Sequence, residues 1–312
     1  MSLVVNYYLE PLLRHQVYQM KSLRIPPPKE FSFELALAFL KRSPRELLHK
    51  IIDNRIEKAL RIGDAIVIFS IRQNKDDLLV EFLNTKVTVL QATEVVKYIR
   101  EWLDLDTDLK PFYAMCEKDK LLKNLVVNYY GYRIIGQPDL FESIVWAVLG
   151  QQINLAFAYT LKQKFVERFG EAVTLKEETY YLFPRPETVA QLTVEQLLSI
   201  QFSRQKATYT INIAKKFAEG AVSKDKLLGM SLKEAKDLLM DIKGIGNWTA
   251  NYALMKTFRH ADAFPLEDAG LHNAIKNLKK TNRKPSLDEV KKIFKKYKGW
   301  EAYATLYLWK SL

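Results

Sequence analysis

Residues 241–271, DIKGIGNWTANYALMKTFRHADAFPLEDAGL, combine residue types and spacings that suggest chemistry. Gly244 and Gly246 predict a tight turn between two helices, because glycine permits positive φ and close backbone approach. The free amides that open the second helix can bind an anion such as a phosphate, and Lys243 adds a positive charge beside the turn. An ordinary helix-to-helix turn has the same pattern, so on this motif alone both interpretations stay open.

Two carboxylates, Glu267 and Asp268, follow this turn at the start of another predicted helix. There a carboxylate complements the helix dipole and caps free amides. A carboxylate fixed in this way could also stabilise a developing cation or take a proton from water. Capping and catalysis are compatible for Asp268, since the cap fixes its position. For Glu267 a capping or solvated role is the preferred interpretation.

The composition indicates a polyanionic partner. The chain has 312 residues, with 48 Lys and Arg against 36 Asp and Glu, a net charge of +12 and a pI near 9.4. The resulting field attracts nucleic acid, although a merely soluble basic protein has the same charge balance. The basic runs at 276–284 and 291–298 fit either phosphate attraction or plain solvated helix faces.

Cysteine and histidine usage excludes several classes of site. The single cysteine, Cys116, allows no internal disulfide, no cysteine-rich zinc site and no four-cysteine iron–sulfur cluster. The histidines show no close ligand spacing and are predicted to be ordinary surface or core residues: His15, His49, His260 and His272. The N-terminal sequence lacks the features of a signal peptide, and no apolar run reaches membrane-spanning length. We therefore expect an intracellular, cytoplasmic protein.

The element pattern predicts an α+β fold in two domains. In residues 1–106, two β-branched-rich runs at 65–72 and 77–84 predict a hairpin, and 93–105 has a helical pattern. Aspartates and a proline near residue 107 predict the boundary to a second, mainly helical domain, 107–312.

Within the second domain, local signals position the helices. The run 139–170 is helical in period, with GQQ at 150–152 as its predicted interruption. Capping boxes predict three further helix starts: Thr193 with Gln196, Ser231 with Glu234, and Ser286 with Glu289. The helix-turn-helix that contains the glycines is predicted at about 232–258.

These motifs occur together in one known family. The sequence KGIGNWTANYAL followed by FPLEDAGL resembles the signature of the helix-hairpin-helix DNA glycosylase superfamily, in particular its alkylation-repair branch, DNA-3-methyladenine glycosylase II. Weaker likenesses occur in the expected order at 142–158, 202–217 and 299–309. The resemblance covers most of 107–312, and the N-terminal region fits the extra sheet domain of this branch by pattern.

The resemblance implies a reaction and its catalytic group. Asp268 occupies the position of the family's essential aspartate. Trp248 stands where the members that also nick the backbone carry a Schiff-base lysine, and tryptophan cannot form an imine. We therefore expect a monofunctional enzyme that flips alkylated purines out of double-stranded DNA and hydrolyses their N-glycosidic bond. The single cysteine separates the chain from the iron–sulfur relatives.

The resemblance also implies binding residues. The predicted base pocket comprises Trp248, Tyr252 and Trp309, whose ring faces attract a cationic base. Core packing is preferred for Trp146, Trp300 and Tyr303. The predicted DNA contacts are Gln151, Gln152, Lys243, Gly244, Ile245, Gly246 and Thr249. The backbone carbonyls of Met240, Ile242 and Ile245 would hold a monovalent cation, Na or K, and no organic cofactor is expected.

Three positions depart from the family pattern. Gly299 and Glu301 replace a proline and a basic residue, and Gln152 stands where a bacterial relative has a leucine wedge. A polar bend between helices explains Gln151 and Gln152 equally well.

Two alternatives remain open. One is a glycosylase for deaminated or oxidised bases, and the other is a non-catalytic helix-hairpin-helix DNA-binding protein. The second has no need of Asp268. The family usually acts as a monomer.

Overall fold

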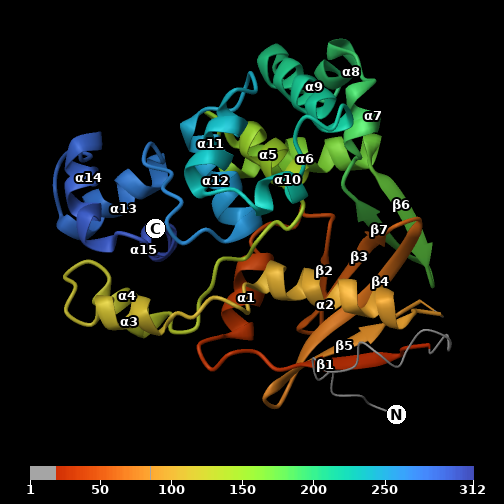
Figure 1. Cartoon of the computed structure of the whole chain (residues 1–312), viewed down its shortest axis with the longest axis horizontal. Helices are drawn as coiled ribbons and strands as arrows, with labels where there is room; N and C mark the ends of the chain where they lie inside the picture. Colours follow the sequence, from red (N-terminus) through yellow and green to blue (C-terminus); the bar gives the residue numbers. More distant parts are fainter. Residues whose placement is uncertain (1–18, 85) are drawn as a thin grey trace.

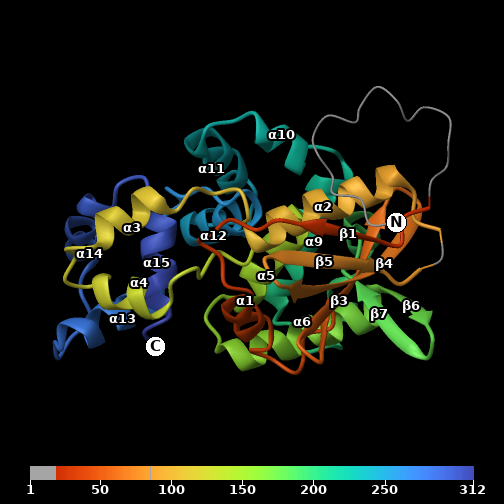
Figure 2. The same cartoon turned by 90° about the horizontal axis from the view of Figure 1, so that it is seen from below.

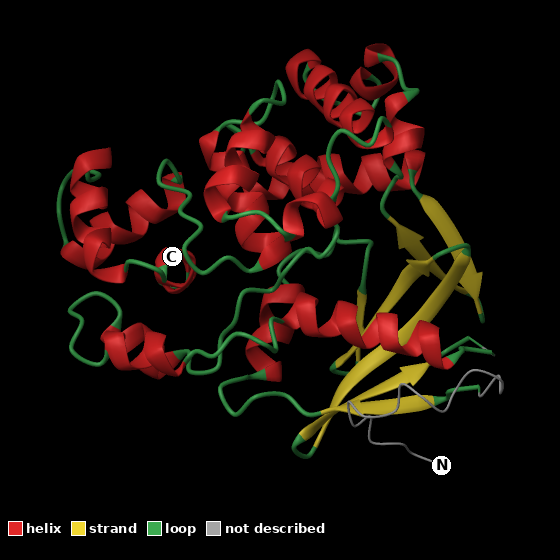
Figure 3. Cartoon of the chain, in the orientation of Figure 1, coloured by secondary structure: helices red, strands yellow, loops and turns green. Residues whose placement is uncertain are grey.

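A computed structural model describes residues 19–84 and 86–312 and shows a sheet domain followed by a helical domain (Figures 1 and 3). The predicted α+β fold is confirmed. The five-stranded antiparallel sheet has the order β1-β5-β4-β3-β2. Its strands are β1 (Ser22–Ile25), β2 (Lys50–Ile52), β3 (Arg55–Ile62), β4 (Ala65–Asn74) and β5 (Asp77–Phe82). The predicted hairpin is β4–β5, which pairs from Phe69↔Phe82 to Asn74↔Asp77.

Two helices, α1 (Phe33–Leu40) and α2 (Val89–Leu103), cover one face of this sheet (Figure 1). Alternating strand residues such as Val67 and Phe69 pack with the buried side of α2, including Val95 and Ile99. Thr88 and Gln91 form a capping box that starts α2. The predicted helical pattern at 93–105 is therefore confirmed, with the helix beginning earlier than the prediction.

The other face of the sheet meets a small hairpin that the sequence analysis missed, β6 (Glu171–Leu175) and β7 (Glu178–Leu182). Tyr180 packs with Ala59 and Ile68 and donates its hydroxyl to Glu57 Oε2 across 2.6 Å. This part of the chain was assigned to a mainly helical region. The hairpin joins the second domain to the back of the sheet.

The remaining chain is helical. Its helices are α3 (Lys110–Cys116), α4 (Lys123–Asn128), α5 (Leu140–Gly150), α6 (Leu155–Phe169), α7 (Pro186–Ala190), α8 (Val194–Leu198), α9 (Arg204–Ala218), α10 (Lys224–Leu228), α11 (Leu232–Met240), α12 (Asn247–Phe258), α13 (Ala269–Lys279), α14 (Leu287–Phe294) and α15 (Glu301–Trp309). The predicted break near residue 151 separates α5 from α6. All three predicted capping boxes are present, at the starts of α8, α11 and α14.

Two hydrophobic cores meet near the predicted boundary. Residues that pack with the sheet run to Leu105, and those of the helical domain begin at Leu109, although Ile135 belongs to the first core. Buried Arg133 donates to the carbonyls of Asp104 and Thr107 at this junction. In the views of Figures 1 and 2, α3 and α4 lie against α15 rather than against the sheet. Residues 1–18, including His15, lie outside the described part. None of the described helices combines the length and apolarity that crossing a bilayer requires.

Candidate active site

The turn between α11 and α12 has the geometry that its glycines suggest. Gly244 adopts φ +108, and a Cβ at this position would lie 2.5 Å from Cγ of Tyr209. Glycine is therefore required twice, by the positive φ and by the close ring. Gly246 is the N-cap of α12, and no side chain caps this helix. The first amides of α12 are thus left for an external acceptor, and Lys243 is exposed beside them.

A second turn, at the end of α5, is tied to this hairpin. The amide of the Gln151 side chain donates to Thr249 Oγ1 at 3.0 Å and to the Gly244 carbonyl at 3.3 Å. The next residue, Gln152, is exposed and has φ +57. The buried ammonium of Lys206 donates to the carbonyls of Val148, Leu149 and Gln151, which precede Gln152 in the chain, at 2.7 to 3.0 Å. The two predicted DNA-contact segments therefore form one surface.

Asp268 lies at the centre of three donors. It is the N-cap of α13, and Oδ1 accepts from the Leu271 amide at 2.7 Å. The same oxygen accepts from Trp309 Nε1 at 2.7 Å, and Oδ2 accepts from Trp248 Nε1 at 3.0 Å. Capping and indole contacts therefore fix the carboxylate in one orientation. The neighbouring Glu267 is exposed and instead binds Asn247.

Close packing around this carboxylate depends on Gly270. A Cβ there would lie 3.0 Å from Asp268 Oδ1 and 3.3 Å from Nε1 of Trp309. Those distances are tighter than ordinary contact, so a larger residue would push the indole or the carboxylate away. Gly270 was not among the residues predicted from the sequence, although it lies only two residues after the Asp268 carboxylate.

An aromatic wall extends from Asp268. We use this name for the rings of Trp248, Tyr252, Trp146 and Tyr159. Trp248 stacks on Tyr252 with centroids 5.3 Å apart and planes 25° apart, one turn along α12. Trp146 donates to the Tyr252 hydroxyl at 3.0 Å and packs on Tyr159 at 4.8 Å. Burial raises the pKa of Tyr252, so this hydroxyl stays protonated at neutral pH.

The other predicted aromatic residues lie elsewhere. Trp300 and Tyr303 pack on Phe112 in the helical core, and the Tyr303 hydroxyl bonds Asp104. Core packing is thus what the structure shows for both. Trp146 is buried as well, but its ring belongs to the aromatic wall and donates to the Tyr252 hydroxyl.

Comparison with known proteins identifies the family of this site. Residues 145–299 match the model of the HhH-GPD superfamily base excision DNA repair proteins, and residues 47–144 match the N-terminal domain of 8-oxoguanine DNA glycosylase. A DNA-3-methyladenine glycosylase from Bacillus subtilis is 46% identical over 289 residues, which cover 91% of this chain and 95% of the relative. The chain belongs to the HhH-GPD superfamily.

Other relatives agree with this assignment. A putative DNA-3-methyladenine glycosylase from Bacillus subtilis is 35% identical over 219 residues, covering 70% of this chain and 75% of that relative. The solved 3-methyladenine DNA-glycosylase from Archaeoglobus fulgidus superposes with a TM-score of 0.79 at 26% identity, covering 92% of this chain and 96% of that one. The predictions of the superfamily, of the sheet-plus-helices fold and of a base excision repair enzyme are therefore confirmed.

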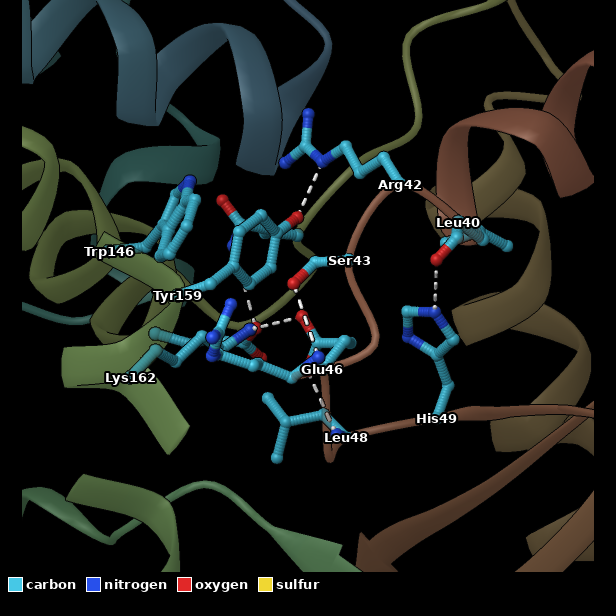
Figure 4. Close-up of polar contacts among 12 residues, drawn as sticks. Leu40, Arg42, Ser43, Glu46, Leu48, His49, Trp146, Tyr159 and Lys162 are labelled. Atoms are coloured by element: carbon cyan, nitrogen blue, oxygen red, sulfur yellow. Dashed lines mark hydrogen bonds and ion pairs between the residues drawn. The ribbon is translucent and has the colours of Figure 1, made fainter. Parts of the chain in front are cut away.

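In this HhH-GPD protein the N-terminal domain also reaches the aromatic wall, which the sequence analysis missed. Figure 4 shows Arg42 and Glu46 of the loop after α1 on the side of Tyr159 and Lys162, whereas His49 bonds the Leu40 carbonyl away from them. Arg42 Nε donates to the Tyr159 hydroxyl at 2.5 Å. The segment KRSPREL resembles a solvated surface turn, so only the folded chain reveals this proximity.

Buried charges lock this contact between the domains. Lys162 on α6 bonds Glu46 at 3.0 Å and Glu142 at 3.1 Å, and all three side chains are nearly buried. Burial, the largest single effect, would raise the pKa of Glu46, but the charge and hydrogen bond of Lys162, the nearby His49 and a hydrogen bond from the Leu48 amide together outweigh it and lower that pKa to about 2. Burial lowers the pKa of His49 to about 4, so this histidine is neutral at pH 7.

Backbone carbonyls are the predicted cation ligands at the hairpin. Within residues 19–84 and 86–312, no group of three His, Cys, Asp or Glu side chains could hold a metal ion. His272 instead binds two backbone carbonyls. In the hairpin, the carbonyls of Lys243 and Gly244 accept from side chains, and that of Ile242 accepts from the Ile245 amide.

Proposed function

We propose that this chain hydrolyses the N-glycosidic bond of alkylated purines in double-stranded DNA and leaves an abasic site. The observation that carries the proposal is the Asp268 carboxylate, held by two indole N–H groups beside the stacked rings of Trp248 and Tyr252. The 46% identical relative named a DNA-3-methyladenine glycosylase supports the choice of substrate class.

The chemistry of the lesion determines what the site must do. A purine alkylated at N3 or N7 carries a positive charge and leaves as a neutral base, so little acid catalysis is needed. The sugar develops oxocarbenium character as the bond breaks. Asp268 would stabilise that charge, or orient and deprotonate the attacking water. Because Oδ2 accepts only from Trp248 among the described residues, it retains a lone pair for this task.

Electron-rich rings suit recognition of the same cationic base. A cation over an aromatic face gains about 0.5 to 2 kcal/mol, depending on desolvation. Trp248 and Tyr252 form a stacked pair of rings that a flipped base could stack on. Trp309 serves the site mainly through its N–H to Asp268.

The hairpin and the α5–α6 turn would hold the DNA. The free amides after Gly244, Ile245 and Gly246 suit a phosphate, and Lys243 adds charge. Gln152, exposed with φ +57, is the candidate to fill the gap left by the flipped nucleotide. Gln151 and Thr249 would hold that residue near the hairpin through their hydrogen bond.

A monovalent cation fits part of the predicted carbonyl set. Met240 and Ile245 have carbonyls without a donor among the described residues, whereas the Ile242 carbonyl is already engaged. Bound there, the cation would supply positive charge toward a DNA phosphate. Met240 and Ile245 would bind it through free backbone oxygens, and Ile242 would use the second lone pair of its engaged carbonyl.

The absence of lyase activity follows from Trp248. Its indole N–H is committed to Asp268, and it offers no amine at the position where strand-cutting relatives carry lysine. Borohydride reduction during turnover should trap no covalent adduct with DNA. Appearance of an adduct would refute the monofunctional assignment.

The direct test is release of 3-methyladenine and 7-methylguanine from methylated duplex DNA. Asp268→Asn should lose at least a hundredfold in rate while its DNA affinity is kept or raised, because the charge that stabilises the transition state is gone. Glu267→Gln is the matched control and should retain wild-type release. Unchanged release by Asp268→Asn contradicts the assignment.

Oxidised bases are the alternative substrate class, because the N-terminal domain matches that of 8-oxoguanine DNA glycosylase. A panel of duplexes with alkylated, deaminated and oxidised bases distinguishes the classes. Strong 8-oxoguanine release without 3-methyladenine release would replace our choice. A monomeric, cytoplasmic enzyme is part of the proposal, and sedimentation with and without DNA tests the monomer.

A further inference from the structure

A loop of the N-terminal domain carries Arg42 to the far end of the aromatic wall. Arg42 follows α1, and its Nε donates to the Tyr159 hydroxyl. Figure 4 shows this side chain reaching from its loop to Tyr159, with Trp146 beside that ring. Trp146 in turn donates to the Tyr252 hydroxyl. One chain of side-chain contacts therefore links Asp268 to Arg42, and Arg42, Tyr159 and Tyr252 line one recess.

The charge of Arg42 is not balanced by a carboxylate within the described part of the chain. Its side chain is exposed, and the guanidinium lies 4.0 Å from the Phe39 ring centroid. Among described residues only Nε has a hydrogen-bond partner, so both Nη groups are free there. The two carboxylates of the same recess, Glu46 and Glu142, are paired with Lys162. The Nη groups are thus available to an acceptor that enters from solvent.

We propose that Arg42 is a specificity-determining residue that reads the edge of the flipped base farthest from the sugar. This inference rests on the proposed function, which places the sugar at Asp268 and the base against Trp248 and Tyr252. The glycosidic bond leaves N9 of the five-membered ring, so the C6 substituent points away from the sugar and toward Arg42. A guanidinium donates to a carbonyl oxygen, as arginine does to O6 of guanine, and it cannot accept from an amino group.

The consequence is discrimination between two alkylated purines. 7-Methylguanine has a carbonyl at C6, whereas 3-methyladenine has an amino group there. Both bases are cationic, so repulsion by Arg42 acts on both and cancels in the comparison. The hydrogen bond remains as the difference, and Arg42 favours 7-methylguanine by about tenfold.

Duplex DNA treated with dimethyl sulfate contains both lesions and permits an internal comparison. The initial rates of release of the two bases are measured by chromatography in one digest, so their ratio does not depend on the folded fraction of the enzyme. Arg42→Ala should lower the ratio of 7-methylguanine to 3-methyladenine about tenfold, mainly through the first base. Arg42→Lys keeps the charge but loses the planar fork and should restore only part of the ratio.

Lys41→Ala is the matched control, because the Lys41 amine bonds Asn54 at 3.0 Å rather than facing the recess. It should leave the ratio unchanged. Equal loss of both bases in Arg42→Ala would overturn the inference, since it indicates a DNA backbone contact or a structural role. Release of neither base by the wild-type enzyme would refute the proposed function itself, and the two failures are therefore distinguishable.

Discussion

Trp309 donates its indole N–H to Oδ1 of Asp268 across 2.7 Å, although 41 residues separate the two in sequence. Trp309→Phe keeps a ring but removes this donor. We expect excision to fall about ten- to a hundredfold, because the carboxylate loses one of the bonds that orient it. Single-turnover rates measure the effect, and Trp300→Phe, which alters a ring packed on Phe112, serves as the control. Equal loss in both variants would show that ring packing, not orientation, is responsible.

Gly270→Ala should separate activity from stability. The new Cβ would lie 3.0 Å from Asp268 Oδ1, so the carboxylate or Trp309 must shift. Alanine favours a helix over glycine by up to about 1 kcal/mol, so the unfolding temperature should not fall. We expect about a tenfold lower excision rate with unchanged or raised stability. Gly229→Ala, which meets nothing within 4 Å, controls for the added methyl. Wild-type excision by Gly270→Ala would contradict the requirement for close packing.

Lys206→Met should impair base flipping. Its ammonium bonds the carbonyls of Val148, Leu149 and Gln151, directly before Gln152. Without those bonds the end of α5 loses its cap, and the turn that carries Gln152 loosens. Stopped-flow fluorescence of 2-aminopurine next to a lesion should show slower flipping, while salt-dependent binding to undamaged DNA persists. The control Lys215→Met changes an exposed residue on the same helix, and this variant should flip the damaged base at the wild-type rate. A wild-type rate of base flipping by the Lys206→Met variant would contradict this role of Lys206.

Acid should weaken the contact between the domains through Glu46. Its pKa is about 2 in the folded protein and about 4.5 when unfolded, so folding favours the ionised form. The stabilisation is present above pH 4.5 and is lost as pH falls toward 2, a contribution of about 3 kcal/mol at most. Urea unfolding between pH 3 and pH 6 should therefore show a shallower pH slope for Glu46→Gln than for wild type. The control Glu117→Gln, an exposed residue, should keep the wild-type slope. An identical slope for Glu46→Gln would contradict this account.

Local signals explain what the sequence could predict. Capping boxes, the β4–β5 hairpin and the break after α5 depend on neighbouring residues, and all of them are present. The family motif placed Asp268, Trp248 and Tyr252 in one region because two of them share a helix.

Non-local packing explains what the sequence could not predict. The β6–β7 hairpin is stabilised by Tyr180 against Glu57 and Ile68 of a distant sheet, and no local pattern signals such a contact. The approach of Arg42 to Tyr159 spans 117 residues and depends on how the two cores pack. Turn sequences of this kind look like solvated surface until the domains are placed.

Two separate parts of the chain provide the groups at the two ends of the aromatic wall. Every group that holds the Asp268 carboxylate comes from residues 248–309, whereas the opposite end is completed by the loop after α1. Substitutions in that loop leave the carboxylate's supports untouched. Substitutions in the loop after α1 could therefore change which lesions such an enzyme accepts, while the groups that break the glycosidic bond stay the same.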